Sequence, residues 1–453
     1  MTDTIAAIAT AAGAGGVGII RISGPQALAI AAAFFNKPLR HRYAHFAKFC
    51  DADGVELDHG LLLYFPAPNS FTGEDVVELQ AHGSPVALSM LLRRCLQLGA
   101  RAARAGEFTE RAFLNQKLDL AQAEAVADLI AAQSEAAATA AIRSLEGEFS
   151  RHVERVLLEL TELRTYVEAL IDFPDEDISF SHDRQIIART ARLNNLLESL
   201  LIQAKRGQRL RDGLYVVIIG PPNAGKSSLL NALAQSDRAI VTAIAGTTRD
   251  VLREQITLNG VPVTLVDTAG LRISPDVIEA EGIRRARLEI ARADLAILLL
   301  GADQPDFSFA DLQRSLPDSL KRICVINKAD LSDALLAQEQ ELLATSVTDA
   351  KLFISTLTGS GLPELCHKIL AVTGSDSAND GSTGTFSARA RHVQALEMVQ
   401  RQLATAQAWL AAEHGELAAE ELRLAQISLS EITGAFSADD LLGKIFSSFC
   451  IGK

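Results

Sequence analysis

The chain has 453 residues, of which 48% are hydrophobic, so it is long enough for about two to four domains with substantial cores. It carries 43 basic and 56 acidic residues, a net charge of −13, which excludes a surface broadly coated with basic side chains for nucleic acid. Its five cysteines lie far apart without a C-x-x-C pair, which indicates neither a disulfide framework nor a zinc site. We expect a cytoplasmic protein, because no apolar run reaches the roughly 18–20 residues of a membrane span and the start lacks the basic segment of a signal peptide.

Residues 1–118 contain short β-like runs at 17–23, 55–65 and 74–82, separated by Gly and Pro, and then a helical run over 85–98. This pattern predicts a compact α+β domain.

From 119 to 212 the chain is rich in Ala, Leu, Glu and Gln, with apolar residues at i, i+3 and i+4, and the same periodicity returns over 385–453. Between these stretches, residues 213–373 alternate short apolar strands with helices, which predicts a doubly wound parallel sheet. The simplest interpretation is a multidomain chain in which an α/β domain is inserted into one all-α domain. Two separate helical domains are the alternative.

The segment GPPNAGKSS (220–228) follows an apolar strand, precedes a helix and matches the P-loop pattern G-x-x-x-x-G-K-[ST]. Its backbone N–H groups would face phosphates, Lys226 would neutralise the β- and γ-phosphates, and Ser227 would hold Mg²⁺. The nucleotide contacts predicted here are Asn223, Ala224, Gly225, Lys226, Ser227 and Ser228.

Three more elements follow in the order expected of a GTPase. DTAG (267–270) comes after a strand, NKAD (327–330) supplies Asp330 to accept two donors that guanine has and adenine lacks, and STLTG (355–359) backs the base, with Ser-Thr replacing the usual Ser-Ala pair. The predicted contacts are Asp267, which acts on Mg²⁺ through water, Thr268, Ala269, Gly270, Asn327, Lys328, Asp330 and Ser355. This part of the chain resembles the translation-factor-related GTPases.

The loop TAIAGTTRD (242–250) supplies Thr248 for Mg²⁺, but Leu271 stands where many signalling GTPases carry a water-orienting glutamine. Glu279 or Glu281 could orient the water instead. We hypothesise that Asn223 and backbone carbonyls near Thr242 and Ile244 coordinate a monovalent cation that offsets transition-state charge; an ordinary loop role for Asn223 is the alternative. The contacts predicted in this loop are Thr242, Ala243, Ile244, Ala245, Gly246, Thr247 and Thr248.

Four further stretches resemble one family, the bacterial and organellar tRNA modification GTPases of the MnmE/TrmE type. They are GGVGIIRISG (15–24), SFTGEDVVELQAHGSPV (70–86), GEFTERAFLNQKLDLAQAEAVADLI (106–130) and DDLLGKIFSSFCIGK (439–453). With the GTPase elements they span essentially the whole chain. The resemblance implies an N-terminal tetrahydrofolate-binding and dimerising domain over 1–118, a helical domain over 119–212 and 385–453, and an inserted GTPase domain over 213–373.

The resemblance also implies site residues. Folate contacts fall on Arg21, Glu78, Lys117 and Lys453, with a 5-formyl or methylene tetrahydrofolate as ligand. Cys450 corresponds to a functional cysteine, which displaces the alternative of a C-terminal lipidation site. The catalytic acid falls on Glu279, and K⁺ on Asn223, Thr242, Ile244 and Thr247.

The implied activity belongs to a homodimer working with a flavin-dependent partner subunit (MnmG/GidA type), which carries FAD, in a heterotetramer or larger complex. Together they build a carboxymethylaminomethyl or aminomethyl group on C5 of the wobble uridine of certain tRNAs, and GTP hydrolysis drives a conformational change. A regulatory GTPase switch in ribosome or RNA assembly is the alternative, and folate binding separates the two.

The chain departs from the family at AAGA (11–14), where Pro-Pro-Gly-Arg is usual, so an arginine expected beside the folate or tRNA is absent. The candidate tRNA-binding patches are Arg101, Arg104, Arg111 and Lys117, and separately Arg40 and Arg42. A solvated helix face is the alternative interpretation of these charges.

Overall fold

The computed structural model describes residues 3–172, 179–235, 253–267, 288–304, 307–314, 316–331, 351–372, 385–435, 439–447 and 449–452. The chain divides into two compact units, each assembled from segments distant in sequence. The first unit comprises Met1–Ala127, Ser144–Leu197 and Ala395–Lys453, and the second comprises Asp128–Arg143 and Glu198–Gln394. The narrower domain limits given above stay a prediction.

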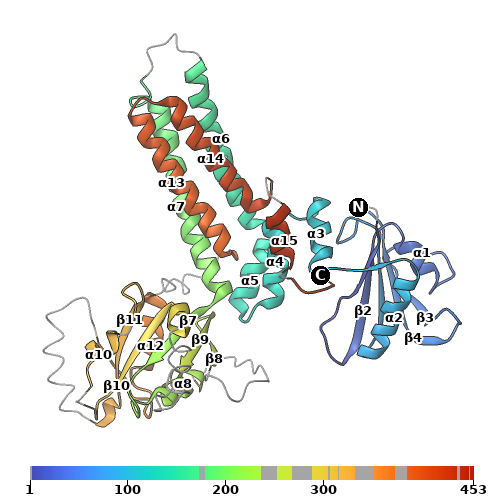
Figure 1. The fold of residues 1–453 in the computed structure, drawn as a ribbon, viewed down its shortest axis with the longest axis horizontal. Coiled ribbons are helices and arrows are strands. Elements are labelled where there is room, and N and C mark those ends of the chain that lie inside the picture. The colour runs from blue at the N-terminus through green and yellow to red at the C-terminus, as the bar shows by residue number, and fades with distance from the viewer. Residues whose placement is uncertain are drawn as a thin grey trace. The chain divides into compact units, whose positions relative to one another are not determined.

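A six-stranded sheet in the order β3-β4-β5-β2-β1-β6 forms the N-terminal part of the first unit (Figure 1). Its strands are β1 (Ile5–Ile8), β2 (Gly15–Ser23), β3 (His45–Cys50), β4 (Glu56–Phe65), β5 (Val76–Gly83) and β6 (Arg101–Ala102). Neighbouring strands are antiparallel except for the parallel pair β1 and β6. The three predicted β-like runs correspond to β2, β4 and β5. In contrast, β1, β3 and β6 lie outside them. For β1 the reason is that the alanines of IAAI carry little strand propensity.

Helices α1 (Ala27–Ala32) and α2 (Pro85–Gln97) pack on one face of this sheet in a shared buried cluster. The predicted helix over 85–98 is confirmed as α2. Pro85 occupies its first turn, and the Ser84 hydroxyl accepts a hydrogen bond from the Ala87 amide at 3.4 Å. In β2 and β5 the residues on this apolar face alternate with Arg21 and Glu78, which therefore belong to the opposite face.

The helical part of the first unit draws on both sides of the inserted domain. Its helices include α3 (Glu107–Leu114), α6 (Glu148–Asp172), α14 (Gly415–Thr433) and α15 (Asp439–Ser447). Helix α6 buries Val153, Val156, Leu160 and Leu163 at helical spacing and packs along α14. Because α6 precedes and α14 follows the GTPase elements, the prediction of one helical domain split in sequence is confirmed.

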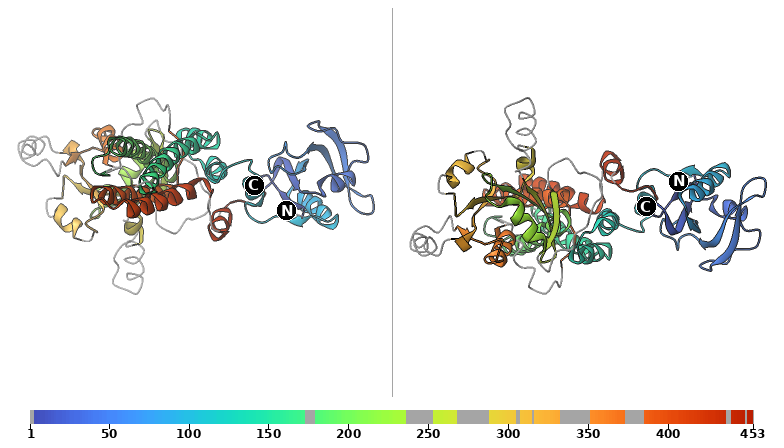
Figure 2. Two further views of the ribbon diagram at one scale, coloured as in Figure 1. Left: turned by 90° about the horizontal axis from the view of Figure 1, so that it is seen from above. Right: turned by 90° about the horizontal axis from the view of Figure 1, so that it is seen from below.

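The chain end returns to the N-terminal sheet within this unit. Phe446 and Phe449 share a buried cluster with Leu120 and Ala123. Figure 2 shows the C-terminal end beside the first strands.

The second unit contains the predicted parallel sheet, in the order β12-β11-β10-β7-β9-β8. Its strands are β7 (Leu214–Ile219), β8 (Arg253–Leu258), β9 (Val261–Asp267), β10 (Leu295–Gly301), β11 (Lys321–Asn327) and β12 (Leu352–Phe353). Only the β8–β9 hairpin is antiparallel. Val216 and Ile218 of β7 enter one buried cluster and Val217 enters another, so both faces of the sheet are covered.

Two helices begin in the first unit and end in this one, α4 (Leu120–Ala131) and α7 (Arg184–Asp212), and α13 (Ala390–Ala411) begins in this unit. The other helices described here are α5 (Glu135–Leu145), α8 (Lys226–Gln235), α10 (Phe309–Gln313), α12 (Leu362–Val372) and the 3₁₀ turn η2 (Ala329–Leu331). Among the described residues, no helix is both long enough and apolar enough to cross a membrane.

Candidate functional site

The P-loop leaves β7 and enters α8 at Lys226, at the position where the strand order of the sheet reverses. The loop turns through left-handed residues, Asn223 at φ +65° and Gly225 at φ +93°. A Cβ on Gly225 would lie 2.2 Å from the Asn327 amide nitrogen. Glycine therefore suits this position both because of the backbone angle and because the Asn327 side chain approaches closely.

Lys226 lies folded over its own loop and is 6% exposed. Its ammonium donates to the carbonyls of Gly220 at 2.8 Å and Pro221 at 2.7 Å. These bonds hold the positive charge at the mouth of the helix, where it can stabilise the negative charge of a bound phosphate.

Two oxygen ligands for a divalent cation meet beside Lys226. Ser227 Oγ donates to Asp267 Oδ2 at 2.9 Å, and Asp267 is 1% exposed at the carboxyl end of β9. A hydroxyl and a buried carboxylate are donors that suit Mg²⁺, so these residues fit the ion expected with GTP.

The base-side loops are tied to the P-loop by Asn327, which is 1% exposed at the end of β11. Its Nδ2 donates to the Ala224 carbonyl at 3.0 Å, and its Oδ1 accepts from the Thr356 amide at 3.2 Å. Since Thr356 contributes its backbone amide here, the Ser-Thr departure in STLTG leaves this contact in place.

Asp330, the predicted guanine-specific residue, is exposed and is held by the next loop. The Ser355 hydroxyl donates to Asp330 Oδ1 at 2.5 Å. Lys328, at φ +64°, donates to Asp303 at 2.7 Å. The structure thus brings the P-loop, Asp267 of DTAG, and residues of NKAD and STLTG together at one edge of the sheet.

The remaining GTPase predictions lie outside the described residues, as does the terminal lysine. They are Glu279, Thr242, Ala243, Ile244, Ala245, Gly246, Thr247, Thr248, Thr268, Ala269, Gly270 and Lys453.

A second polar site lies on the face of the N-terminal sheet that α1 and α2 leave uncovered. Arg21 and Glu78 are register partners on β2 and β5, and Arg21 Nε donates to Glu78 Oε1 at 2.9 Å. The rings of Phe71 and Phe108 flank the guanidinium, at 5.7 and 5.8 Å from their centroids. Neither aromatic residue was among the predicted contacts, although Phe71 lies in the stretch 70–86 and Phe108 in the stretch 106–130 that carry the family resemblance.

The chain end closes over this second site. Arg21 Nη1 reaches the Gly452 carbonyl at 3.5 Å, and the Gly106 amide donates to the Cys450 carbonyl at 3.3 Å. Gly452 has φ +94°, and a Cβ there would lie 2.2 Å from the Ile8 carbonyl oxygen. Cys450 itself is an exposed free thiol.

Lys117 is exposed, and its ammonium donates to the Pro68 carbonyl at 3.1 Å. It therefore holds one end of the loop that presents Phe71 to Arg21. The structure links Lys117 to the Arg21 site through this loop.

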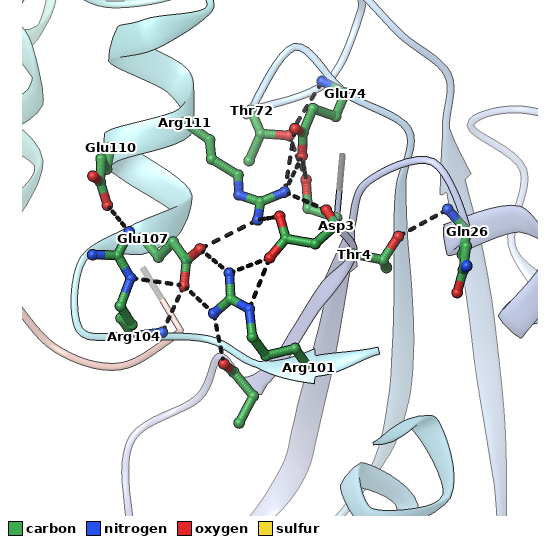
Figure 3. Close-up of polar contacts among 12 residues, drawn as sticks. Asp3, Thr4, Gln26, Thr72, Glu74, Arg101, Arg104, Glu107, Glu110 and Arg111 are labelled. Carbon is green, nitrogen blue, oxygen red and sulfur yellow. Dashed lines mark hydrogen bonds and ion pairs between the residues drawn. The ribbon is translucent and has the colours of Figure 1, made fainter. Parts of the chain in front are cut away.

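The proposed tRNA patch around α3 is wrong for Arg111, whereas Arg101 and Arg104, whose side chains are 43% and 64% exposed, stay a prediction. Arg111 is 0% exposed and lies among Asp3, Glu74 and Glu107, as Figure 3 shows. Arg101 pairs with Asp3 and Glu107, and Arg104 with Glu107 and Glu110 (Figure 3). Arg101 and Arg111 neutralise the buried Glu107 and connect α3 to Asp3, which precedes β1. Arg40 and Arg42 are exposed and stay a prediction.

Glu107 is the most strongly perturbed acid of this network. Burial opposes its charged form, but the hydrogen bonds from Arg101, the Arg104 amide and Arg111 outweigh burial and lower the pKa of Glu107 to about 2. Glu107 therefore remains charged across the physiological range.

Two family models match consecutive parts of this chain. Residues 120–450 match the family model described as MnmE helical domain, and residues 4–117 match that described as GTP-binding protein TrmE N-terminus. The tRNA modification GTPase MnmE of Xanthomonas campestris pv. campestris (strain 8004) is 54% identical over 453 residues, covering 100% of this chain and 99% of its own. The protein of the same name from Pseudomonas aeruginosa (strain UCBPP-PA14) is 52% identical over 458 residues, with the same coverage. Among solved structures, the G domain of the T. maritima FeoB iron transporter is 28% identical and covers 35% of this chain and 96% of its own, but its TM-score of 0.26 is too low to bear on the fold.

Proposed function

This chain belongs to the MnmE family of tRNA modification GTPases, and we propose that it is the potassium-activated member of a two-subunit tRNA-modifying enzyme. With a flavin-dependent partner carrying FAD, it forms the carboxymethylaminomethyl or aminomethyl group at C5 of the wobble uridine. It acts in the cytoplasm as a homodimer, and GTP hydrolysis changes its conformation.

The chain is a GTPase that binds GTP with Mg²⁺. The observation that carries this conclusion is the convergence of Lys226, Ser227 and Asp267 at one edge of the sheet, with Asp330 on the base side. Lys226 balances phosphate charge, Ser227 provides an oxygen ligand for the ion, Asp267 acts on the ion through water, and Asp330 selects guanine.

Potassium activation is supported by the exposed, left-handed Asn223 in the P-loop, whose amide oxygen is an appropriate ligand. We expect GTP turnover to be at least about tenfold faster in potassium than in sodium at equal ionic strength. Asn223→Ala should abolish that difference. Asn259→Ala is a matched control, since Asn259 is another exposed left-handed asparagine, in the β8–β9 turn. Equal rates in both salts for the unaltered chain would rule out the potassium role.

Glu279 is proposed to orient the attacking water. Glu279→Ala should lower kcat on the order of 10²-fold or more while GTP affinity stays unchanged, because the residue acts only in the chemical step. Glu281→Ala, two positions along, is the control. The same loss in both variants, or in neither, would contradict the assignment.

The tetrahydrofolate proposal is supported by the Arg21–Glu78 pair, flanked by Phe71 and Phe108. The carboxylate of Glu78 can accept hydrogen bonds from a pterin ring, while Arg21, Lys117 and Lys453 match the ligand's carboxylates. Calorimetry with 5-formyltetrahydrofolate should show binding that Glu78→Gln weakens at least about tenfold. Glu56→Gln, on the exposed strand β4, is the control. No binding by the unaltered chain would favour a regulatory switch instead.

The whole reaction is tested by mass spectrometry of tRNA nucleosides from cells that lack the protein. The modified wobble uridines should disappear and should return with the unaltered gene but not with Cys450→Ser. Cys50→Ser, in β3, should restore them and serves as the control. Unchanged wobble uridines in the deletion would defeat the proposed function, and rescue by Cys450→Ser would defeat only the role of the thiol.

A further inference from the structure

A cavity of about 250 Å³ lies in the second unit, away from the carboxyl edge of the sheet that holds the nucleotide residues. Helix α5, the last turns of α7, the β8–β9 turn and the start of the segment 385–389 before α13 form its walls. The polar residues that line it are Glu135, Thr139, Arg143, Arg206, Arg209, Asn259 and Thr385.

The lining of this cavity is strongly basic. Arg143, Arg206 and Arg209 contribute three positive charges, and Glu135 is the single carboxylate among the described lining residues. The neighbouring cavity of about 440 Å³, which shares Arg209, differs because Asp212 and Asp294 oppose its cations. The described lining of the smaller cavity therefore has one carboxylate for three guanidinium groups, whereas that of the larger cavity has two carboxylates for three cations.

The walls of the basic cavity are fixed to one another. Ser134, at the start of α5, donates to the Gly260 carbonyl of the β8–β9 turn at 2.6 Å. The Ser387 amide donates to the Ala140 carbonyl of α5 at 3.0 Å. On α7, a Cβ at Gly207 would lie 2.1 Å from the Phe386 carbonyl oxygen, so the backbones touch there. These contacts make the cavity preformed, which lowers the entropic cost of binding.

Arg209 faces this cavity with an unsatisfied charge. With the described residues its guanidinium makes no hydrogen bond or ion pair, although it is only partly exposed. Burial lowers the pKa of Arg209, and Asp294 opposes that effect only in part. A partly buried guanidinium of this kind gains most from an anion that accepts two of its N–H groups.

We propose that the basic cavity between α5, α7 and the β8–β9 turn is a second anion site, which binds a phosphate group. The volume lies below the roughly 300–1,000 Å³ of pockets for drug-sized ligands, so the bound group is small. Arg209 provides paired donors that match phosphate oxygens, and the guanidinium groups of Arg143 and Arg206, which also have other partners, add positive charge that disfavours a metal cation. Both a free polyphosphate and a tRNA phosphodiester offer this chemistry. The site is independent of the proposed tRNA-modifying reaction.

The test uses the full chain with GDP and Mg²⁺ at saturation, so that the P-loop is occupied, and titrates it with diphosphate in a calorimeter. We expect one diphosphate to bind per chain and the double variant R206Q/R209Q to weaken this binding at least about tenfold. K205Q is the matched control, since Lys205 lies on the same helix but lines only the larger cavity. Unchanged GDP affinity shows that each variant is folded.

A second variant, Thr139→Glu, places a carboxylate one turn from Arg143 on α5 and leaves all three arginines in the chain. It should reduce binding to the same extent even if the double variant is unstable. In a parallel arm, tRNA affinity is measured for the same proteins. If the variants lose diphosphate binding but keep their tRNA affinity, the ligand is a free polyphosphate. If the unaltered chain does not bind diphosphate and the variants lose about tenfold in tRNA affinity, the ligand is a backbone phosphate of tRNA. If neither affinity differs from that of K205Q, the proposal is overturned.

Discussion

The nucleotide site and the Arg21 site are built in opposite ways. The nucleotide residues follow directly after strands β7, β9 and β11 of one parallel sheet, so the fold collects them at the carboxyl edge. At the other site, Arg21 meets Glu78 across a strand pair and Gly452 from a position 431 residues away in sequence. Short motifs suffice to recognise the first site, whereas the second depends on how the ends of the chain pack.

The largest effect should come from the ion-pair network that supports the second site. Arg111→Gln would leave Glu74 and Glu107 without their buried partner, at a cost of about 3–5 kcal/mol in the free energy of unfolding. Hydrogen exchange of the β2 and β5 amides in the full chain measures this cost. Arg104→Gln, whose side chain is 64% exposed, is the control and should cost less than about 1 kcal/mol. If both variants lost the same free energy of unfolding, the buried ion pairs of Arg111 would contribute no more than the surface pairs of Arg104.

The nucleotide site should lose catalysis without losing its fold. Lys226→Ala removes the ammonium that the Gly220 and Pro221 carbonyls hold at the phosphate position, and kcat for GTP should fall on the order of 10²–10³-fold. Hydrogen exchange of the parallel sheet should remain unchanged. Lys321→Ala, at the opposite end of β11, provides the control in steady-state assays. A fall in kcat of similar size for both variants would contradict the role of Lys226.

The ion-pair network that supports the Arg21 site should also respond to acid. The pKa of Glu107 is lowered from 4.5 to about 2, so its contribution to stability is present above pH 4.5 and is lost as the pH falls from 4.5 through 2. This shift corresponds to about 3 kcal/mol. Unfolding of the N-terminal sheet, followed by hydrogen exchange against pH, should show the loss, and Glu107→Gln should flatten the curve. A profile that the substitution leaves unaltered would exclude Glu107 as the source.

The smallest effect should come from the chain end. Gly452→Ala forces a Cβ against the Ile8 carbonyl at a left-handed position, which costs about 1–3 kcal/mol and should release the tail. The Gly106 amide, which donates to Cys450, should then exchange about tenfold faster. Gly443→Ala, in α15 with no atom within 4 Å of the added Cβ, is the control. An unchanged exchange rate would show that the tail does not depend on Gly452.

Much of the GTPase domain could be predicted because short, contiguous stretches of sequence specify its strands and its nucleotide contacts. The apolar runs at β7, β9, β10 and β11 and the motifs that follow them specify both the sheet and the edge where Lys226, Asp267 and Asp330 meet. Apolar spacing likewise indicated the split helical domain, because one face of each long helix must be buried.

The sequence by itself therefore determined the class of each domain and the guanine nucleotide site. Only the tertiary structure decided that Arg111 is an internal counterion and not a surface for tRNA, and that the chain end covers Arg21. Arg111 pairs with Asp3, which is 108 residues away in sequence. Such pairs form only when distant segments pack, so local charge patterns cannot reveal whether an arginine faces solvent or a buried acid.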